Sequence, residues 1–265
     1  MNDQQQPIII SVDGLIGAGK TALCELLGAK LAEAISEIAV ASHDEYSSKL
    51  IEHAKTGDVT VEVIFEPVEI WKSSGALARF YADVKNRAYE FQSFVYTTRV
   101  EAVRDAVEKY RLAHDGKDAD IYILERSVFS DEYLFVEMLY RDNILDDTQM
   151  IMYRKWCRMW DLLMPWFPSG FVYLSPSLEE TMRRISARNR SGETVSLDYQ
   201  SALLDRHEEV FGGETVHIAH RIGERLAYPV QHIRTDEDFR LENGGHKKIV
   251  STIAQFAVTL ATTKK

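Results

Sequence analysis

Eight residues near the N-terminus have the types and spacing of a phosphate-binding loop. Residues 14–21 read Gly-Leu-Ile-Gly-Ala-Gly-Lys-Thr and fit the pattern G-x-x-x-x-G-K-[ST], between an apolar segment and a helix-forming one. The glycines let the backbone approach a ligand, and N–H groups at the start of a helix point at phosphate oxygens. This context favours a nucleoside triphosphate site over a chance glycine-rich turn. Lys20 would reach the β- and γ-phosphates, and the Thr21 hydroxyl could ligate Mg²⁺. The predicted ligands are Gly14, Gly17, Ala18, Gly19, Lys20 and Thr21.

Two acidic residues follow apolar segments farther along the chain. Glu66 comes after residues 61–65, and the proline behind it keeps it extended at a strand end. A carboxylate there could take the proton of a hydroxyl that attacks the γ-phosphate, although a surface glutamate before a turn is an equal reading of the local sequence. Glu125 follows residues 121–124, where P-loop enzymes place the acid that organises Mg²⁺. Arg126 suits a substrate hydroxyl or phosphate, with a structural ion pair as the alternative.

A third group of candidate residues is basic. Four arginines occur between residues 183 and 190. Arg184 and Arg188 are four residues apart and share one helical face, while Arg190 lies just beyond, before a helix-breaking Ser-Gly. Such a cluster could close over a nucleotide and stabilise charge on the transferred phosphoryl group. In an acidic chain this favours a functional lid at residues 183–194 over a solvated cationic face.

The segments that must position these groups alternate between strand and helix. This alternation predicts an α/β fold of the P-loop NTPase class, with a five-stranded parallel sheet flanked by helices. Such sheets bind ligands at the carboxyl ends of their strands, which is where Glu66 and Glu125 fall. The predicted strands are residues 8–12, 61–65, 121–124, 171–174 and 230–233.

The remaining organisation is simple. No Pro/Gly/Ser-rich linker divides the 265 residues, so we expect one domain over residues 1–265. Residues 33–60 are longer than a typical connection and are interpreted as a surface insertion near the substrate side. Long helices are expected at residues 87–113 and 153–167, where aromatic residues at helical spacing indicate core or an oligomer interface.

Composition narrows the class of partner. Lys and Arg total 31 against 41 Asp and Glu, a net charge of −10, which disfavours nucleic acid as a partner and favours a small molecule. No apolar run is long enough to span a bilayer, and the polar N-terminus has no signal-peptide pattern. Cys24 and Cys157, without metal-ligand spacing, indicate reduced thiols and a cytoplasmic protein.

Taken together, these motifs resemble those of the deoxynucleoside kinase family from about Ile8 to Phe239. The resemblance implies transfer of the γ-phosphate of ATP to the 5′-hydroxyl of a deoxynucleoside, with Mg²⁺ as cofactor. It also implies a homodimer, paired through the helices that contain Gln92 and Trp156. The motifs are the phosphate loop, Phe-Glu-Pro-Val at 65–68 with Trp71, Phe80-Tyr81, Phe-Gln-Ser-Phe at 91–94, Glu125-Arg126-Ser127 with Ser130-Asp131, and the lid.

The resemblance also implies a role for each residue. Glu66 would be the general base, Arg126 would hold it and the 5′-hydroxyl, and Glu125 with Thr21 would serve Mg²⁺. Gln92 would read the base, Phe129 would stack on it, and Tyr81 with Glu193 would bind the 3′-hydroxyl. Lys20, Arg188 and Arg190 would complete the catalytic group. Beyond the loop, the implied ATP contacts are Arg184, Arg188, Asp238 and Phe239. The implied nucleoside contacts are Glu66, Trp71, Phe80, Tyr81, Gln92, Val95, Arg99, Arg126, Phe129, Asp131 and Glu193.

Base choice depends on Arg99 and Asp131, which match the charged pair of the deoxycytidine and deoxyguanosine kinases. A buried pair of this kind favours deoxycytidine or a purine deoxynucleoside over thymidine. Val95 instead resembles the thymidine-using branch, and Phe80 could narrow the pocket, so a broad or thymidine-preferring kinase stays open.

Two rival functions fit less well. A nucleoside monophosphate kinase such as thymidylate kinase shares the loop and a lid, but Glu66 would repel an acceptor phosphate. A GTPase-like switch needs a guanine-reading Asn-Lys-x-Asp, which the sequence lacks.

Overall fold

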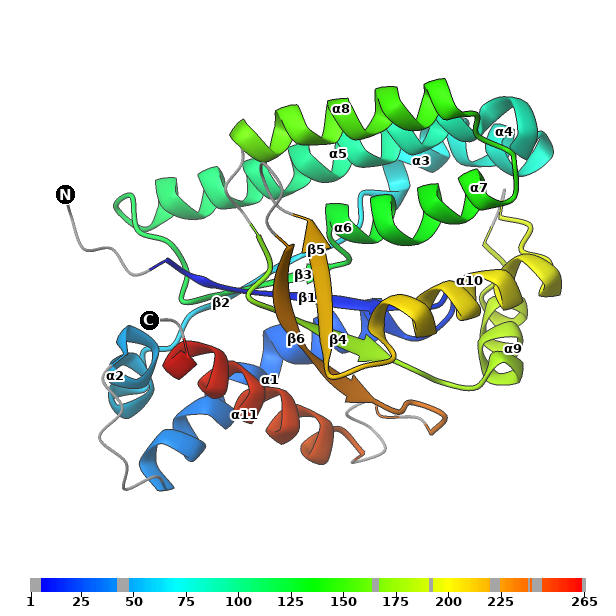
Figure 1. Cartoon of the computed structure of the whole chain (residues 1–265). Coiled ribbons are helices and arrows are strands. Elements are labelled where there is room, and N and C mark those ends of the chain that lie inside the picture. The colour runs from blue at the N-terminus through cyan, green and yellow to red at the C-terminus, as the bar shows by residue number, and fades with distance from the viewer. Residues whose placement is uncertain are drawn as a thin grey trace.

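A sheet with the strand order β2–β3–β1–β4–β6–β5 organises the chain (Figure 1). The structure is a computed structural model and describes residues 6–41, 48–163, 167–190, 193–219, 225–237, 239 and 245–263. Every residue of β1, β3 and β4 is buried, as expected for parallel strands covered by helices on both faces. The strands are β1 (Ile8–Gly14), β2 (Val61–Ile64), β3 (Ile121–Glu125), β4 (Gly170–Leu174), β5 (Thr215–Ala219) and β6 (Arg225–Ile233).

The α/β class with a mostly parallel sheet is confirmed, but the prediction of five strands is wrong by one. The five predicted segments form the parallel set, and β5 adds a sixth strand that runs antiparallel to β6, with Val216 opposite Tyr228. Strand β6 also begins at Arg225, before the predicted 230–233 segment. β5 alternates the buried Val216 and Ile218 with exposed polar residues. An alternation of buried and exposed residues this short does not identify a strand from sequence. The strand becomes evident only from the pairing of β5 with β6.

Helices cover both faces of this sheet (Figure 1). Helices α1 and α11 pack against each other on one face, while α5 and α8 lie together across the other. The helices are α1 (Lys20–Ala41), α2 (Lys49–Thr56), α3 (Val68–Ser73), α4 (Ala76–Ala82), α5 (Val84–Ala113), α6 (Val128–Ser130), η1 (Asp131–Val136), α7 (Glu137–Arg141), α8 (Asp147–Leu163), α9 (Leu178–Arg188), α10 (Leu197–Phe211) and α11 (His246–Thr263). None of the helices in the described ranges is both long and apolar enough to cross a membrane.

The predicted insertion at residues 33–60 contains the end of α1 and the short helix α2; residues 42–47 lie outside the described part. Helix α2 is capped by Ser48, whose hydroxyl accepts from the N–H of Ile51. It is held by the buried carboxylate of Asp120, which accepts from His53 Nδ1 at 2.9 Å and from the backbone N–H of Thr60 at 3.0 Å. Asp120 and Thr60 precede β3 and β2. The described helix therefore lies at the amino ends of the strands, and its expected place near the substrate side is wrong.

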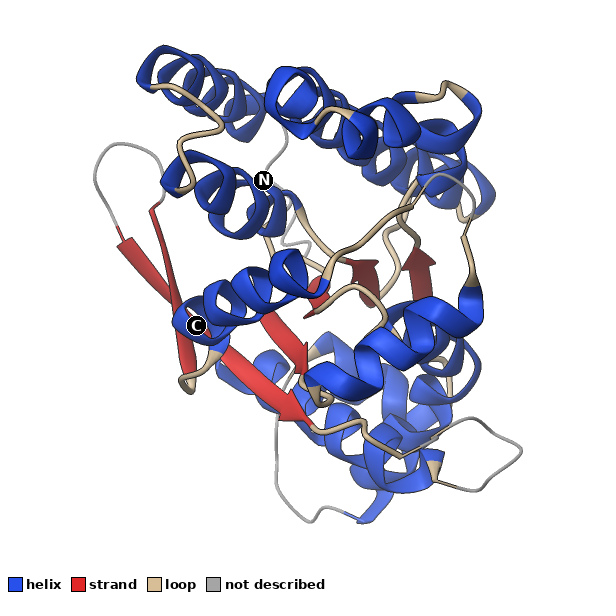
Figure 2. Cartoon of the chain, turned by 90° about the vertical axis from the view of Figure 1, so that its right-hand side faces the viewer, coloured by secondary structure: helices blue, strands red, loops and turns tan. Residues whose placement is uncertain are grey.

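The candidate site residues lie at the opposite edge of the sheet, at the carboxyl ends of the parallel strands. Figure 2 looks toward the carboxyl ends of the parallel strands, which helices surround. The segment after β3 changes pitch there: α6 is followed by η1, a π-helix with hydrogen bonds from residue i to i+5, and then by α7. The loop after β1, the ends of β2 and β3 and this π-helix therefore converge on one region.

Candidate active site

The phosphate loop has the expected strand–loop–helix setting. It joins the end of β1 at Gly14 to the start of α1 at Lys20. Gly17 has a φ of 83°, in the left-handed region, and a Cβ there would lie 2.7 Å from the carbonyl oxygen of Thr181 on α9. Glycine is therefore required both by the backbone and by the close approach of the lid helix.

A cavity of about 690 Å³ opens beside this loop at the carboxyl edge of the sheet. All five predicted catalytic residues line it, as do both predicted Mg²⁺ ligands. Of the predicted nucleoside contacts, all but Phe129 line the same cavity. The structure therefore brings together residues that lie as far apart in the sequence as Gly17 and Glu193.

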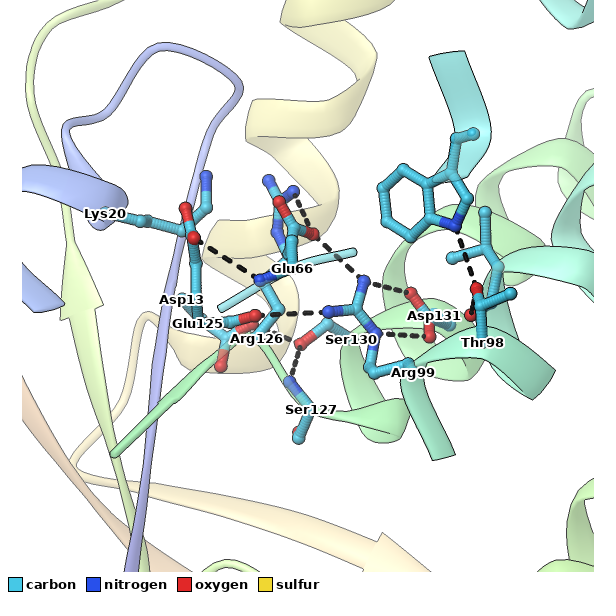
Figure 3. A network of polar contacts seen from close by, with 12 residues as sticks. Asp13, Lys20, Glu66, Thr98, Arg99, Glu125, Arg126, Ser127, Ser130 and Asp131 are labelled. Atoms are coloured by element: carbon cyan, nitrogen blue, oxygen red, sulfur yellow. Dashed lines mark hydrogen bonds and ion pairs between the residues drawn. The ribbon is translucent and has the colours of Figure 1, made fainter. Parts of the chain in front are cut away.

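One carboxylate oxygen stands at the centre of the network in Figure 3. Glu66 Oε1 accepts from Arg99 Nη2 at 2.9 Å and from Arg126 Nη1 at 3.2 Å. Arg126 also donates to the Gly14 carbonyl at 2.7 Å, so the acid and the phosphate loop share one guanidinium. Arg126 itself has a φ of 59°, an unusual value for a side chain with a Cβ, and often found where function fixes the backbone.

The two buried glutamates of the cavity differ in their proton affinity. Burial would raise the pKa of Glu66, but Arg126 and Arg99 outweigh it and lower the pKa to about 2. Burial raises the pKa of Glu125, and the charge of Glu66 adds to that effect. Glu66 is thus held ionised, and Glu125 is the carboxylate that would gain most from an added cation.

Glu125 is also the group best placed to meet a metal ion. Thr21 Oγ1 donates to Glu125 Oε1 at 2.5 Å, and the backbone N–H of Glu66 lies 3.4 Å from Oε2. The described residues contain no group of three or more His, Cys, Asp or Glu placed to hold a metal. One carboxylate and one hydroxyl fit Mg²⁺, which takes few protein ligands and keeps water or phosphate oxygens.

Arg99 and Asp131 form a buried ion pair in the wall of the cavity. Arg99 Nε donates to Asp131 Oδ2 at 2.8 Å, and Nη2 donates to Oδ1 at 3.1 Å. The same guanidinium donates through Nη1 to the Glu125 carbonyl at 3.1 Å. Arg99 therefore bonds the carboxylates of Asp131 and Glu66 at the same time.

The lid arginines contact backbone carbonyls and acidic side chains. Arg184 donates to the carbonyl of Ala18 at 3.1 Å, which fixes α9 on the phosphate loop. Arg188 donates to Glu193, and Arg190 lies 3.7 Å from the same carboxylate. Residues 191–192 of the lid lie outside the described part.

A smaller cavity of about 410 Å³ lies on the outer side of the loop, lined by Gly19, Arg184 and Phe239 among others. Asp238, a predicted ATP contact, lies outside the described residues.

Comparison with known proteins decides the family. The model of the deoxynucleoside kinase family matches residues 10–258. The chain belongs to the deoxynucleoside kinase family.

Its relatives include deoxycytidine and deoxyguanosine kinases. A probable deoxycytidine kinase of fowlpox virus is 29% identical over 248 residues, covering 93% of this chain and 87% of that protein. Mouse deoxycytidine kinase is 26% identical over 95% of this chain and 91% of its own length. A mitochondrial deoxyguanosine kinase of Xenopus laevis is 25% identical over 98% and 93%. The chain is accordingly a kinase of this family.

Phe129, the predicted base-stacking residue of this kinase, lies elsewhere. Its ring packs against Phe167 at 5.6 Å, and Phe129 is absent from the described residues that line the main cavity. Phe135 lines the cavity instead, with the Arg126 guanidinium 4.9 Å from its ring centre. Phe129 belongs to α6, whereas Phe135 belongs to the π-helix η1, which also carries the cavity residue Asp131.

The aromatic wall is fixed by polar and ring contacts. Trp71 Nε1 donates to Thr98 Oγ1 at 2.8 Å, and the Trp71 ring meets Phe91 edge-on at 6.2 Å. Phe80 stacks on Phe91 with ring centres 4.6 Å apart. The amide of Gln92, on the same helix α5, lines the cavity beside this wall.

Sequence reasoning also missed Asp13 and Tyr199, two further residues around the site. Asp13 is fully buried and accepts from Ser11 and from Ser130, the neighbour of Asp131, and burial raises its pKa. Tyr199 lines the cavity from α10. The only available signal was the position of Asp13 at a strand end beside the loop.

Lys20 leads to a prediction about pH. Burial, together with the charge of Arg126, lowers the pKa of Lys20 from 10.5 to about 7, and its Nζ donates to the carbonyls of Leu15 and Gly14. A triphosphate beside Nζ favours the ammonium form. Above pH 7, where the free lysine is mostly neutral, we therefore expect triphosphate binding to take up close to one proton and to weaken as pH rises.

Calorimetric titration with ATP and Mg²⁺ at about pH 8, in buffers of different ionisation enthalpy, measures that uptake. The matched variant is Lys20→Arg, whose guanidinium is already charged at this pH. Equal proton uptake in the two proteins would contradict the assignment to Lys20.

Proposed function

We propose that this kinase transfers the γ-phosphate of ATP to the 5′-hydroxyl of a deoxynucleoside. The observation that carries the proposal is the ionised carboxylate of Glu66, held by Arg99 and Arg126 beside the phosphate loop. A carboxylate there accepts a proton from an attacking hydroxyl. It would repel an acceptor that is itself a phosphate, which disfavours a monophosphate kinase.

The proposed reaction divides the work among the chain's own residues. The loop N–H groups and Lys20 bind the phosphates, while Arg188 and Arg190 leave Glu193 to neutralise charge on the transferred group. Arg126 orients the 5′-hydroxyl toward Glu66, which takes its proton as the oxygen attacks. Mg²⁺, held through Thr21 and Glu125, would neutralise charge on the phosphates.

The acceptor pocket supports a preference for amino-bearing bases. Asp131 and Arg99 line the cavity, buried and bonded to each other, so a base must match the groups they present. The amino group of cytosine or adenine can donate to a carboxylate, whereas thymine offers a carbonyl and a methyl group there. Gln92 reads the base edge with its amide, and Phe135 replaces Phe129 as the proposed stacking residue. Tyr81 and Glu193 remain the proposed partners of the 3′-hydroxyl.

Glu66→Gln tests the general base. The amide keeps the size of the side chain but cannot accept the proton, so we expect kcat to fall by about 10²–10⁴-fold. Binding of ATP, measured by calorimetry, should stay within a few-fold of the parent because Lys20 and the loop are unchanged. A variant that keeps full turnover would contradict the assigned role of Glu66.

A parallel phosphorylation assay tests substrate class and base choice. With ATP and Mg²⁺ we expect turnover of deoxycytidine, deoxyadenosine or deoxyguanosine to exceed that of thymidine at least tenfold, because a buried unmatched pair is costly. Dominant turnover of thymidine would overturn the base preference and leave the kinase reaction intact. Turnover of dTMP alone would overturn the proposed acceptor.

We further propose a cytoplasmic homodimer with no nucleic-acid partner, in keeping with two buried cysteines that form no disulfide and a net charge of −10. Helix α8 exposes Ile151, Met152, Trp156 and Met159, an apolar stripe suited to a second copy.

Trp156→Glu should then shift the protein from dimer to monomer in light scattering. Val40→Glu, the same replacement at an exposed apolar residue of α1, should not. A parent protein that is monomeric at micromolar concentration would contradict the dimer.

A further inference from the structure

Helix α10, which follows the lid, carries a polar side chain that has no task in the site as described so far. Gln200 is fully buried, and its Nε2 donates to the carbonyl of Ile16 at 2.5 Å. Ile16 lies within the phosphate loop, and the two residues are 184 positions apart in the sequence. Because a carbonyl can only accept, the amide nitrogen of Gln200 must be the group that faces it.

This hydrogen bond fixes the direction of a phosphate-binding N–H. The carbonyl of Ile16 and the N–H of Gly17 belong to one planar trans peptide, so they point in opposite directions. Gly17 lines the main cavity, while Gln200 holds the Ile16 oxygen on the buried side. Holding that oxygen therefore aims the Gly17 N–H toward the place where phosphates bind.

Burying the amide of Gln200 is energetically unfavourable, which indicates that the amide has a structural role. Its Oε1 is buried and, among the residues that the structure describes, finds no hydrogen-bond partner. A buried amide that is only half satisfied is destabilising, and an apolar side chain of similar volume would avoid that penalty. The bond to Ile16 is what an apolar replacement would lose.

Helix α10 also contacts the acceptor side of the site, six residues after Gln200. Arg206 Nε donates to the carbonyl of Tyr133 at 2.7 Å. Tyr133 lies in the π-helix η1, which brings Asp131 and Phe135 to the cavity. Arg206 is itself almost fully buried, and its Nη1 lies 2.6 Å from Glu209. One rigid helix thus bonds to the donor loop at one point and to the acceptor helix at another.

We propose that Gln200 and Arg206 are positioning residues through which α10 holds the phosphate loop and the π-helix in a fixed relation. Gln200 sets the donor side through Ile16, and Arg206 sets the acceptor side through Tyr133. The inference rests on the proposed function for what binds on each side.

The first test replaces Gln200 by methionine, which keeps the volume and removes the donor. We expect KM for ATP, and the dissociation constant of ADP with Mg²⁺ measured by calorimetry, to rise about tenfold. KM for the deoxynucleoside should change less than twofold. Gln200→Asn, which keeps the amide but is too short to reach Ile16, should give the same split and serves if the methionine variant does not fold.

The second test is Arg206→Met, which removes the donor to Tyr133. It should raise KM for the deoxynucleoside severalfold and leave nucleotide binding unchanged. Glu209→Gln is its control, because it weakens the surface contact of Arg206 but keeps the Nε bond. Both KM values of this control should match the parent.

Leu203→Val controls for general loosening of α10, since this side chain is fully buried on the same helix and makes no polar contact with the loop. It should lower Tm without separating the two KM values. The inference is overturned if Gln200→Met leaves nucleotide binding unchanged, or if it moves both KM values together as Leu203→Val would. A parent protein that binds the nucleotide but phosphorylates no deoxynucleoside would reject the proposed function instead, and the calorimetric test of Gln200 would still be decisive.

Discussion

The carboxylate of Glu66, bonded to two arginines in a buried cavity, is the interaction on which the rest of the site depends. An isolated ionised carboxylate would be strongly destabilising at this depth, so cations must accompany it. Arg99 comes from α5 and Arg126 from the end of β3, and both donate to the same oxygen. Because these arginines also hold Asp131 and the Gly14 carbonyl, a single charge requirement ties the sheet, the phosphate loop and the acceptor helix together.

Burial disfavours the ionised forms of several charged groups at the site. Asp13 and Glu125 are buried at the site, and burial raises the pKa of both acids. Burial also lowers the pKa of Lys20, which lines the same cavity as Glu125, to about 7. A ligand that brings a cation to Glu125 and an anion to Lys20 would relieve both penalties at once, and a magnesium–triphosphate complex is such a ligand. The destabilised charges are thus an argument for the proposed donor that does not depend on the relatives.

Most of the site could be predicted from the sequence because the carboxyl ends of parallel strands lie at one edge of the sheet. Neighbouring strands lie about 4.8 Å apart, so polar residues that follow β1, β2 and β3 must meet. Glu66 follows β2 and Glu125 ends β3, and both line the cavity beside the phosphate loop that follows β1. The pairing of Arg99 with Asp131 was also expected, although only through the family resemblance. Strand β5 was missed because an antiparallel edge strand of alternating polarity carries little local signal.

What could not be predicted depends on contacts whose geometry no local pattern encodes. The family resemblance pointed to Phe129 as the base-stacking residue, but Phe135, in the π-helix that starts at Asp131, lines the cavity instead. This π-helix is held from α10, where Arg206 donates to the carbonyl of Tyr133. Gln200 is hidden from sequence reasoning for the same reason, since its partner is a backbone carbonyl at the other end of the chain. Residues that bind ligands form recognisable sequence motifs. Residues that hydrogen-bond the backbone of those motifs can be identified only from the fold, which brings the two segments together.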